Sequence, residues 1–325
     1  MTKLNMCLLM MFFLFFFACK KDITNDGTTN IKEVTTPTPL IDFGNATYRG
    51  FQGGLYPNGS NQRPAAHNAA GVAISQNIKP LNSTGSIDDA NGKIVWMSIG
   101  MSNATQETQA FLSLMQTYAN KNPKLTLLDG AEGGMDINAI NSANAAYWGD
   151  VNARLTTAGL TPAQVQIIWY KEAEAQPADT SFDSYPNALK MKYRSVMQLL
   201  KAKFPNLKLV YLSDRIYAGY ATSDLNPEPF AWYTGWTVKR LIEDQISGDA
   251  SLNYTGANPS AAWLSWGPYL WAKGTTPRSD GLTWLPSDYQ SDGTHPSATG
   301  RQKVAQMLLQ FFSTDETAKT WFLKP

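Results

Sequence analysis

The sequence predicts an α/β domain, with a parallel sheet covered by helices on both faces. Short apolar runs that fit buried strands alternate with longer stretches in which apolar residues recur at helical spacing. Such alternation implies repeated βαβ units, whose strands run parallel. With 43% hydrophobic and 16% charged residues over a length of 325, the chain has ample material for a core, and we interpret residues 43–325 as one domain.

The elements follow in order after a loop-rich stretch over residues 43–92. Strands are expected as short apolar runs at 94–97, 125–128, 165–169, 207–212 and, more weakly, 261–266. Helices are expected between and after them at about 105–120, 145–157, 186–203 and 228–246, with a closing helix that ends near Phe312. Pro296 suits the first turn of that closing helix, because its missing N–H would have no partner there.

The N-terminus is typical of an exported protein. Residues 1–18 contain Lys3 and then an apolar run too short to span a bilayer comfortably, as in a secretory signal peptide. Cys19 follows a small residue, which resembles a bacterial lipoprotein signal whose cysteine is lipidated; an ordinary signal peptide is the alternative. Residues 19–42 are polar and predict a flexible tether. We therefore expect a lipid anchor on Cys19, at the periplasmic or cell-surface face of a bacterial membrane.

Cysteine and charge content exclude several kinds of site. If Cys7 leaves with the signal and Cys19 carries lipid, the domain has no cysteine for disulfides, thiol catalysis or metal binding. The two histidines lie far apart in the sequence, which disfavours a zinc site. The net charge of +1, without clusters of Lys and Arg, disfavours nucleic acid as a partner. No metal and no organic cofactor is expected.

Sites in parallel sheets form at the carboxyl ends of the strands, so the segments after each strand matter most. Ser102 follows the first strand, at the start of a helix whose free N–H groups and dipole would stabilise an oxyanion. A structural alternative is that Ser102 caps the helix. Gly133 and Gly134 follow the second strand, where they could supply a further backbone N–H or simply form a tight turn.

Charged and aromatic residues follow the third and fourth strands. Lys171 and Glu172 end the third strand, where they belong either to the site or to a solvated loop. Arg215 and Tyr217 follow the fourth strand, and we expect them to line the wall of a pocket.

Asp292 and His295 stand just before the closing helix. A neutral imidazole within reach of a serine hydroxyl can act as a general base, and an aspartate on its other nitrogen fixes the tautomer. The pair therefore predicts a catalytic role with Ser102; the alternative is a surface turn capped by Asp292.

These motifs together resemble the SGNH (GDSL-type) hydrolases, over most of residues 93–312. The resemblance rests on Gly-Met-Ser-Asn at 100–103, the glycine loop after the second strand, and Asp-Gly-Thr-His-Pro at 292–296. It implies a three-layer α/β/α fold with a flavodoxin-like parallel sheet. It also implies Ser102 as nucleophile, His295 as base, Asp292 as its partner, and the N–H groups of Ser102 and of Gly134 or Gly133 as oxyanion donors.

The sequence departs from the family pattern at two places. Met101 replaces an aspartate that many members carry, and no asparagine follows the third strand. Lys171 is predicted to replace that asparagine as an oxyanion donor, because an ammonium donates hydrogen bonds and a carboxylate does not. Glu172 is assigned to the substrate pocket with Arg215 and Tyr217.

The expected function is that of a serine esterase. The resemblance, export and aromatic content suggest removal of acetyl or similar acyl groups from a small molecule or polysaccharide. The alternatives are a surface glycan-binding protein on a degenerate fold with little catalysis and, more weakly, a lipase. His67 is expected to be structural, or else to line the pocket from the N-terminal loops.

Overall fold

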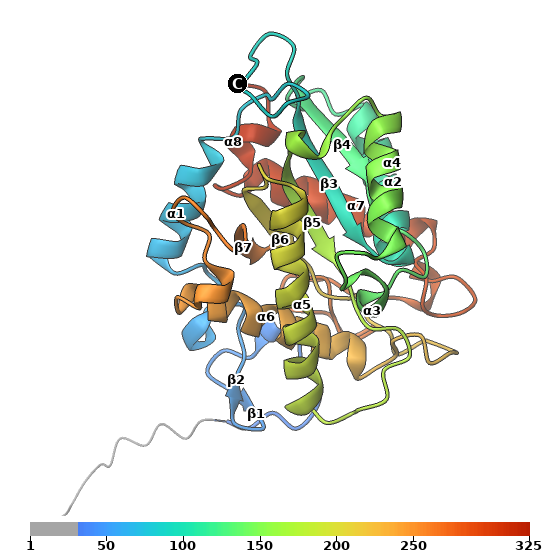
Figure 1. The fold of residues 1–325 in the computed structure, drawn as a ribbon. Coiled ribbons are helices and arrows are strands. Elements are labelled where there is room, and N and C mark those ends of the chain that lie inside the picture. The colour runs from blue at the N-terminus through green and yellow to red at the C-terminus, as the bar shows by residue number, and fades with distance from the viewer. Residues whose placement is uncertain (1–31) are drawn as a thin grey trace, which may run out of the picture. The chain divides into compact units, whose positions relative to one another are not determined.

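Five parallel strands form the central sheet of the computed structural model, which describes residues 32–325 (Figure 1). The strands are β3 (Ile94–Gly100), β4 (Leu125–Asp129), β5 (Val165–Lys171), β6 (Leu209–Leu212) and β7 (Trp263–Trp266). They lie in the order β4-β3-β5-β6-β7, which is the flavodoxin-like order of a doubly wound sheet. All neighbouring pairs in it are parallel, so the predicted fold class is confirmed.

Helices cover both faces of the sheet, which gives the three layers of an α/β/α sandwich. One face carries α1 (Ala65–Ser75), α2 (Ser102–Gln116), α7 (Ala298–Thr314) and α8 (Lys319–Phe322), and the other carries α3 (Ile137–Ile140), α4 (Ala146–Thr157), α5 (Ser184–Lys203) and α6 (Phe230–Ile246). Short 3-10 turns lie at Leu40–Asp42, Pro57–Gly59, Pro162–Gln164, Ala250–Leu252 and Pro286–Asp288. Each predicted strand and helix after residue 93 is present within a few residues of its expected position.

The domain has two hydrophobic cores, one on each face of the sheet, because successive side chains of a buried strand point to opposite faces. On β3, Ile94 and Trp96 face the α2 and α7 side, whereas Val95, Met97 and Ile99 face the α5 and α6 side. All seven residues of β3 are buried, as expected for a central strand covered on both faces. The first strand is thus held rigidly at the point where Ser102 begins α2.

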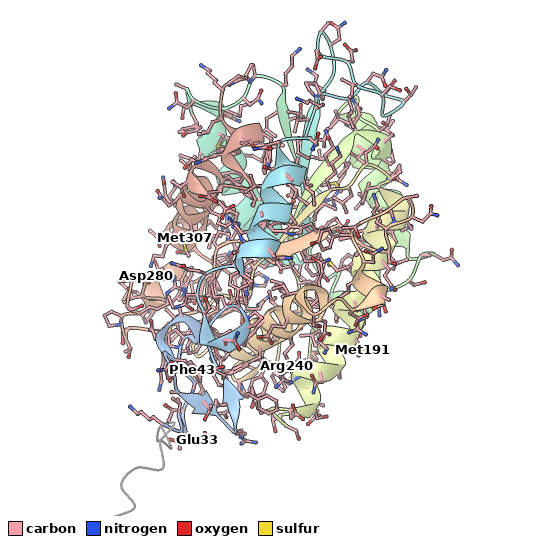
Figure 2. The ribbon with its side chains drawn as sticks, turned by 90° about the vertical axis from the view of Figure 1, so that its left-hand side faces the viewer. Glu33, Phe43, Met191, Arg240, Asp280 and Met307 are labelled. Atoms are coloured by element: carbon pink, nitrogen blue, oxygen red, sulfur yellow. The ribbon has the colours of Figure 1, made fainter. Side chains whose placement is uncertain are left out.

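The segment before residue 43 is packed against the domain, which differs from the predicted tether over residues 19–42. Leu40 is fully buried, and the indole N–H of Trp232 donates to the backbone oxygen of Thr38 at 2.8 Å. Glu33, labelled in Figure 2, pairs with the strand β1 (Thr47–Tyr48). The expectation of a tether came from the polar composition of this segment, which does not indicate that Leu40 is buried.

The structure differs from the prediction at two further places, the stretch 43–92 and the start of the closing helix. The stretch 43–92 contains α1 and a small antiparallel hairpin, in which β1 pairs with β2 (Phe51–Gln52). Pro296 precedes α7 rather than lying in its first turn, because Ser297 is the N-cap and accepts a hydrogen bond from the N–H of Gly300. The reason is that a serine side chain can cap the helix and proline cannot.

The predicted signal peptide at 1–18, the lipidation site Cys19 and the first part of the predicted tether lie outside the described residues. Within residues 32–325, no helix is both long enough and apolar enough to cross a membrane.

Candidate active site

The strand β3 delivers Ser102 to the carboxyl edge of the sheet, at the first residue of α2. The N-cap of this helix is Met101, which makes no side-chain capping bond, so the structural alternative of Ser102 as N-cap does not hold. Within residues 32–325, the N–H of Ser102 has no hydrogen-bond acceptor. An uncapped helix N-terminus thus presents a free N–H and the positive end of its dipole beside the Ser102 hydroxyl.

The turn before α7 positions His295 and Asp292. One Asp292 carboxylate oxygen accepts the backbone N–H groups of Thr294 and His295, at 2.9 and 3.0 Å. Its other oxygen lies 2.5 Å from Nδ1 of His295. Gly293 adopts a φ of 64° in this turn, and a side chain there would run into the backbone of Tyr220, so glycine is required.

The fold brings these two segments together across 193 residues of sequence. The Ser102 Oγ lies 2.8 Å from Nε2 of His295, so serine, histidine and aspartate form one continuous chain of hydrogen-bonding groups. His295 and Asp292 keep 22% and 39% of their side chains exposed, so the chain of groups is open to a substrate from solvent.

Asn103 ties the same two segments beside this chain of groups. Its buried side-chain amide donates to the backbone oxygen of Thr294 at 3.1 Å. The bond links the first turn of α2 to the turn that carries His295, and α2 and α7 pack against each other beyond it. Asn103 had no predicted role, although it belongs to the Gly-Met-Ser-Asn motif.

The glycine loop after β4 lies next to Ser102. An imagined Cβ on Gly133 would stand 3.7 Å from Cβ of Ser102, which places the two backbones side by side. Gly134 has a φ of 79°, which suits glycine, and within residues 32–325 neither glycine donates its N–H to an acceptor. Both glycines are exposed, so their N–H groups can reach a bound substrate.

Hydrogen bonds at both ends hold the glycine loop in place. The N–H of Glu132 donates to Gly100 of β3 at 2.9 Å, next to the Ser102 turn. Asp136 caps α3 and also accepts the N–H of Ala175, from the segment after β5, at 2.9 Å. The loop is therefore anchored to both neighbouring strand ends.

Lys171 is engaged elsewhere, which contradicts its predicted role as an oxyanion donor. Its ammonium contacts both carboxylate oxygens of Glu107 at 2.5 Å, and the two side chains are 1% and 0% exposed. Burial lowers the pKa of Lys171 and raises that of Glu107, and each partner opposes the other's shift. A buried ammonium paired in this way is not free to bind a developing negative charge.

Glu172 also differs from its predicted place in the substrate pocket, because its side chain is fully buried. One carboxyl oxygen accepts the N–H of Ala173 at 2.8 Å, and the other has no partner within residues 32–325. Burial raises the pKa of Glu172 well above its ordinary value.

Of the two residues predicted to line the pocket after β6, Arg215 is buried and Tyr217 is partly exposed. Arg215 is 3% exposed, and burial lowers the pKa of its guanidinium against the attraction of Glu107 and Glu172. Tyr217 is only half-buried and packs edge-on against Tyr220, whose backbone adjoins Gly293. Of the four residues predicted to complete the site after β5 and β6, only Tyr217 keeps an exposed side chain near the Asp292 turn.

His67 occupies a structural position on α1. Its Nε2 donates to the backbone oxygen of Leu264 at 2.8 Å, and its ring stacks on Trp263. Burial lowers the pKa of His67, which favours the neutral ring in that contact. Among residues 32–325, no group of three or more His, Cys, Asp or Glu side chains is placed to hold a metal ion.

Comparison with known proteins yields only distant structural similarity. No model of a known protein family and no curated protein matches the sequence. A candidate GDSL-like lipase from Parabacteroides merdae shares 14% identity over 67% of this chain and 95% of its own, with a TM-score of 0.39. A candidate acylhydrolase from Bacteroides fragilis shares 11% identity over 77% of this chain and 96% of its own, with a TM-score of 0.38.

A salicylyl-acyltransferase from a tetracycline biosynthetic pathway shares 13% identity over 70% of this chain and 56% of its own, with a TM-score of 0.34. With identities this low and TM-scores below 0.5, none of these likenesses decides what this chain does.

Proposed function

We propose that this chain is a serine ester hydrolase of the SGNH type, with Ser102 as nucleophile. The main support for this proposal is a chain of two hydrogen-bonding contacts. Oγ of Ser102 lies 2.8 Å from Nε2 of His295, and Nδ1 of His295 lies 2.5 Å from a carboxylate oxygen of Asp292. This is the arrangement by which a histidine activates a serine for acyl transfer.

The proposed reaction begins with proton transfer to His295. Because Nδ1 faces the Asp292 carboxylate, Nδ1 carries the hydrogen and Nε2 is free to accept the proton of Ser102. As the Oγ–carbonyl bond forms, His295 becomes charged and then gives its proton to the departing alkoxide. Water, deprotonated by the same nitrogen, then attacks the acyl-enzyme. The bond between the acyl carbon and Oγ breaks, the acid is released, and His295 returns the proton to Ser102.

Two backbone groups serve as oxyanion donors in this proposal. They are the N–H of Ser102 at the start of α2 and an N–H of the glycine loop, from Gly133 or Gly134. With Lys171 paired to Glu107, this lysine does not take the place of the asparagine in the family pattern. Since one donor contributes roughly 100- to 1,000-fold to the rate, we expect a modest esterase. The mechanism needs no metal or organic cofactor.

The substrate and location are proposed from the sequence. We propose acetyl or similar acyl esters of carbohydrate as substrates, and export with a lipid on Cys19 as the membrane anchor. The aromatic content of 12% and the N-terminal apolar run support this view.

The test is hydrolysis of p-nitrophenyl acetate by the purified protein. Ser102→Ala and His295→Ala should each abolish the activity, whereas Ser113→Ala, an exposed serine further along α2, should leave it unchanged. Full activity in either of the first two variants refutes the assignment.

A second candidate function is glycan binding with little catalysis. It is favoured because Lys171 is paired with Glu107 and is not free to bind an oxyanion. A fluorophosphonate probe separates the two functions, because it labels an activated serine and not an inert one. Labelling at Ser102 supports the esterase. Absence of labelling, together with binding to a polysaccharide, supports the second candidate.

A further inference from the structure

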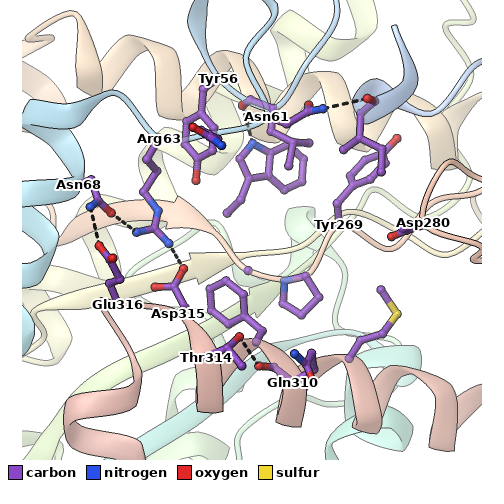
Figure 3. Close-up of a pocket in the computed structure, with 18 of the residues that line it drawn as sticks. Tyr56, Asn61, Arg63, Asn68, Tyr269, Asp280, Gln310, Thr314, Asp315 and Glu316 are labelled. Carbon is purple, nitrogen blue, oxygen red and sulfur yellow. Dashed lines mark hydrogen bonds and ion pairs between the residues drawn. The ribbon is translucent and has the colours of Figure 1, made fainter. Parts of the chain in front are cut away.

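A large groove lies apart from Ser102, between the N-terminal segment, the chain after β7 and the second half of α7 (Figure 3). Its volume is about 1070 Å³, and neither Ser102, Asp292 nor His295 lines it. Along α7 it begins at Gln306, roughly 12 Å along the helix axis from Ala298. Figure 2 shows Asp280 and Met307, which both line the groove, on the same side of the molecule.

The charges that line the groove are compensated. Arg63 pairs with Asp315 and donates to Asn68, as Figure 3 shows, and Arg278 pairs with Asp280 at 2.7 Å. Glu316, the remaining carboxylate, accepts a hydrogen bond from Asn68 at 3.0 Å. Because both guanidinium groups already have carboxylate partners, the groove is poorly suited to a phosphate or carboxylate ligand.

Uncharged amides supply its free hydrogen-bonding groups. Gln62, Gln306 and Gln310 are exposed, and within residues 32–325 their side chains make no hydrogen bond; the bond from Thr314 goes to the backbone oxygen of Gln310. Gln306 and Gln310 are four residues apart and lie on one face of α7. Asn61 donates to the backbone of Ile41 at 2.8 Å, which leaves its side-chain oxygen free. Each amide offers both a donor and an acceptor, or an acceptor alone, as sugar hydroxyls require.

Apolar and aromatic side chains lie between these amides. The apolar surface comes from the partly exposed side chains of Ile41, Leu55, Met307 and Phe311, whereas the rings of Tyr56, Trp266 and Tyr269 lie behind it and are 5% exposed or less. A mixed surface of this kind can bury the C–H faces of a sugar ring while the amides meet its hydroxyls.

The sheet edge beside the groove is blocked to an added peptide strand at one residue of β7. A peptide would most readily add to the free edge of β7, the last strand of the sheet. That edge is closed at Leu264, whose N–H donates to Gln245 at 2.7 Å and whose carbonyl accepts from His67 at 2.8 Å.

We propose that this groove binds a segment of an uncharged polysaccharide. The volume is at the upper end of the range for small-molecule sites, which suits several sugar units better than one. The groove binds the polymer and does not cleave it. Binding there does not require the proposed reaction at Ser102.

The experiment is affinity electrophoresis of the full chain in native gels that contain arabinoxylan, glucomannan or dextran. At least one of these uncharged polymers should retard the protein. The double variant Gln306→Ala/Gln310→Ala should weaken the apparent affinity about tenfold, because it removes two amides that hydrogen-bond the ligand. Gln302→Ala, an exposed glutamine of α7 outside the groove, is the matched control and should bind as the unaltered chain does.

Two further measurements separate this proposal from the proposed esterase. Ser102→Ala should still be retarded, and Gln306→Ala/Gln310→Ala should still hydrolyse p-nitrophenyl acetate at the unaltered rate. The proposal is overturned if no uncharged polymer retards the chain or if the double variant binds as well as the control. It is equally overturned if only dextran sulfate or a casein digest is bound.

Discussion

The surroundings of Asp292 and Asp129 shift the pKa values of their carboxyl groups in opposite directions. Although partial burial raises the pKa of Asp292, hydrogen bonds from the His295 ring and from the backbone of His295 and Thr294 hold it below its ordinary value. Burial raises the pKa of Asp129, at the end of β4, to about 6, against the hydrogen bonds from Ser98 and Ala131. Asp292 is therefore charged at neutral pH, whereas Asp129 titrates close to it.

Asp292→Asn should lower kcat for p-nitrophenyl acetate by roughly 10³- to 10⁴-fold, because an amide does not hold Nδ1 as the protonated nitrogen. The side-chain oxygen of asparagine can still accept the backbone N–H groups of the turn, so the melting temperature should change little. Steady-state kinetics and a thermal melt check both parts. A variant that keeps its kcat would show that Asp292 only shapes the turn.

Asp129→Asn should stabilise the protein at pH 8 and have little effect at pH 4. The raised pKa means that the folded state binds this proton more tightly than the unfolded state, so stability falls as pH rises from 3.8 through about 6. Asparagine removes that loss, which amounts to no more than about 3 kcal/mol. Urea denaturation at both pH values measures it; a stability gain that is equal at the two pH values would contradict the explanation.

Contacts between elements align Ser102 with His295. Asn103 links α2 to the turn before α7, and the buried pair of Glu107 and Lys171 links α2 to the end of β5. The buried pair therefore orients the helix that begins at Ser102, in place of the oxyanion role that the sequence suggested for Lys171.

Lys171→Met should destabilise the fold by about 3–5 kcal/mol, because it leaves the Glu107 carboxylate buried without its partner. The double variant Lys171→Met/Glu107→Leu should recover most of that loss, since it removes both charges. A double-mutant cycle in urea measures the coupling.

Activity of the same double variant distinguishes positioning from catalysis. If Lys171 only supports α2, a folded double variant should hydrolyse p-nitrophenyl acetate within about tenfold of the unaltered rate. A loss of roughly 100- to 1,000-fold in a double variant with unchanged stability would restore Lys171 as an oxyanion donor.

Residues 32–42 pack against the rest of the domain and add Leu40 to its core. Leu40 is fully buried, Phe43 beside it is 5% exposed and packs edge-on against Trp236, and Thr38 accepts the indole N–H of Trp232. This segment closes the core around α6 and lies close to the groove, which Ile41 lines.

A chain that begins at residue 43 should be less stable than one that begins at residue 32. Loss of Leu40 alone removes a buried side chain worth about 1.5–3 kcal/mol. Urea denaturation of the two chains compares them directly. Equal stabilities would mean that the segment behaves as the tether that its composition suggests.

Prediction succeeded where a pattern repeats over many residues. The apolar runs of the five strands and the helical spacing on α2, α5 and α7 identified the α/β fold and its layers. It missed α1, whose sequence AAHNAAGVAIS has few large apolar residues, and it missed the docking of residues 33–42, which depends largely on Leu40. Single contacts of this kind leave no periodic signal in a sequence.

The order of apolar runs and polar residues along the chain is enough to identify which residues end each strand, and therefore which are candidates for the site. The contact between Ser102 and His295, the burial of Lys171 against Glu107 and the groove along α7 become visible only in the folded chain. The physical reason is that local spacing determines the elements, whereas the partner of a charged or polar side chain is set by packing between segments far apart in the chain.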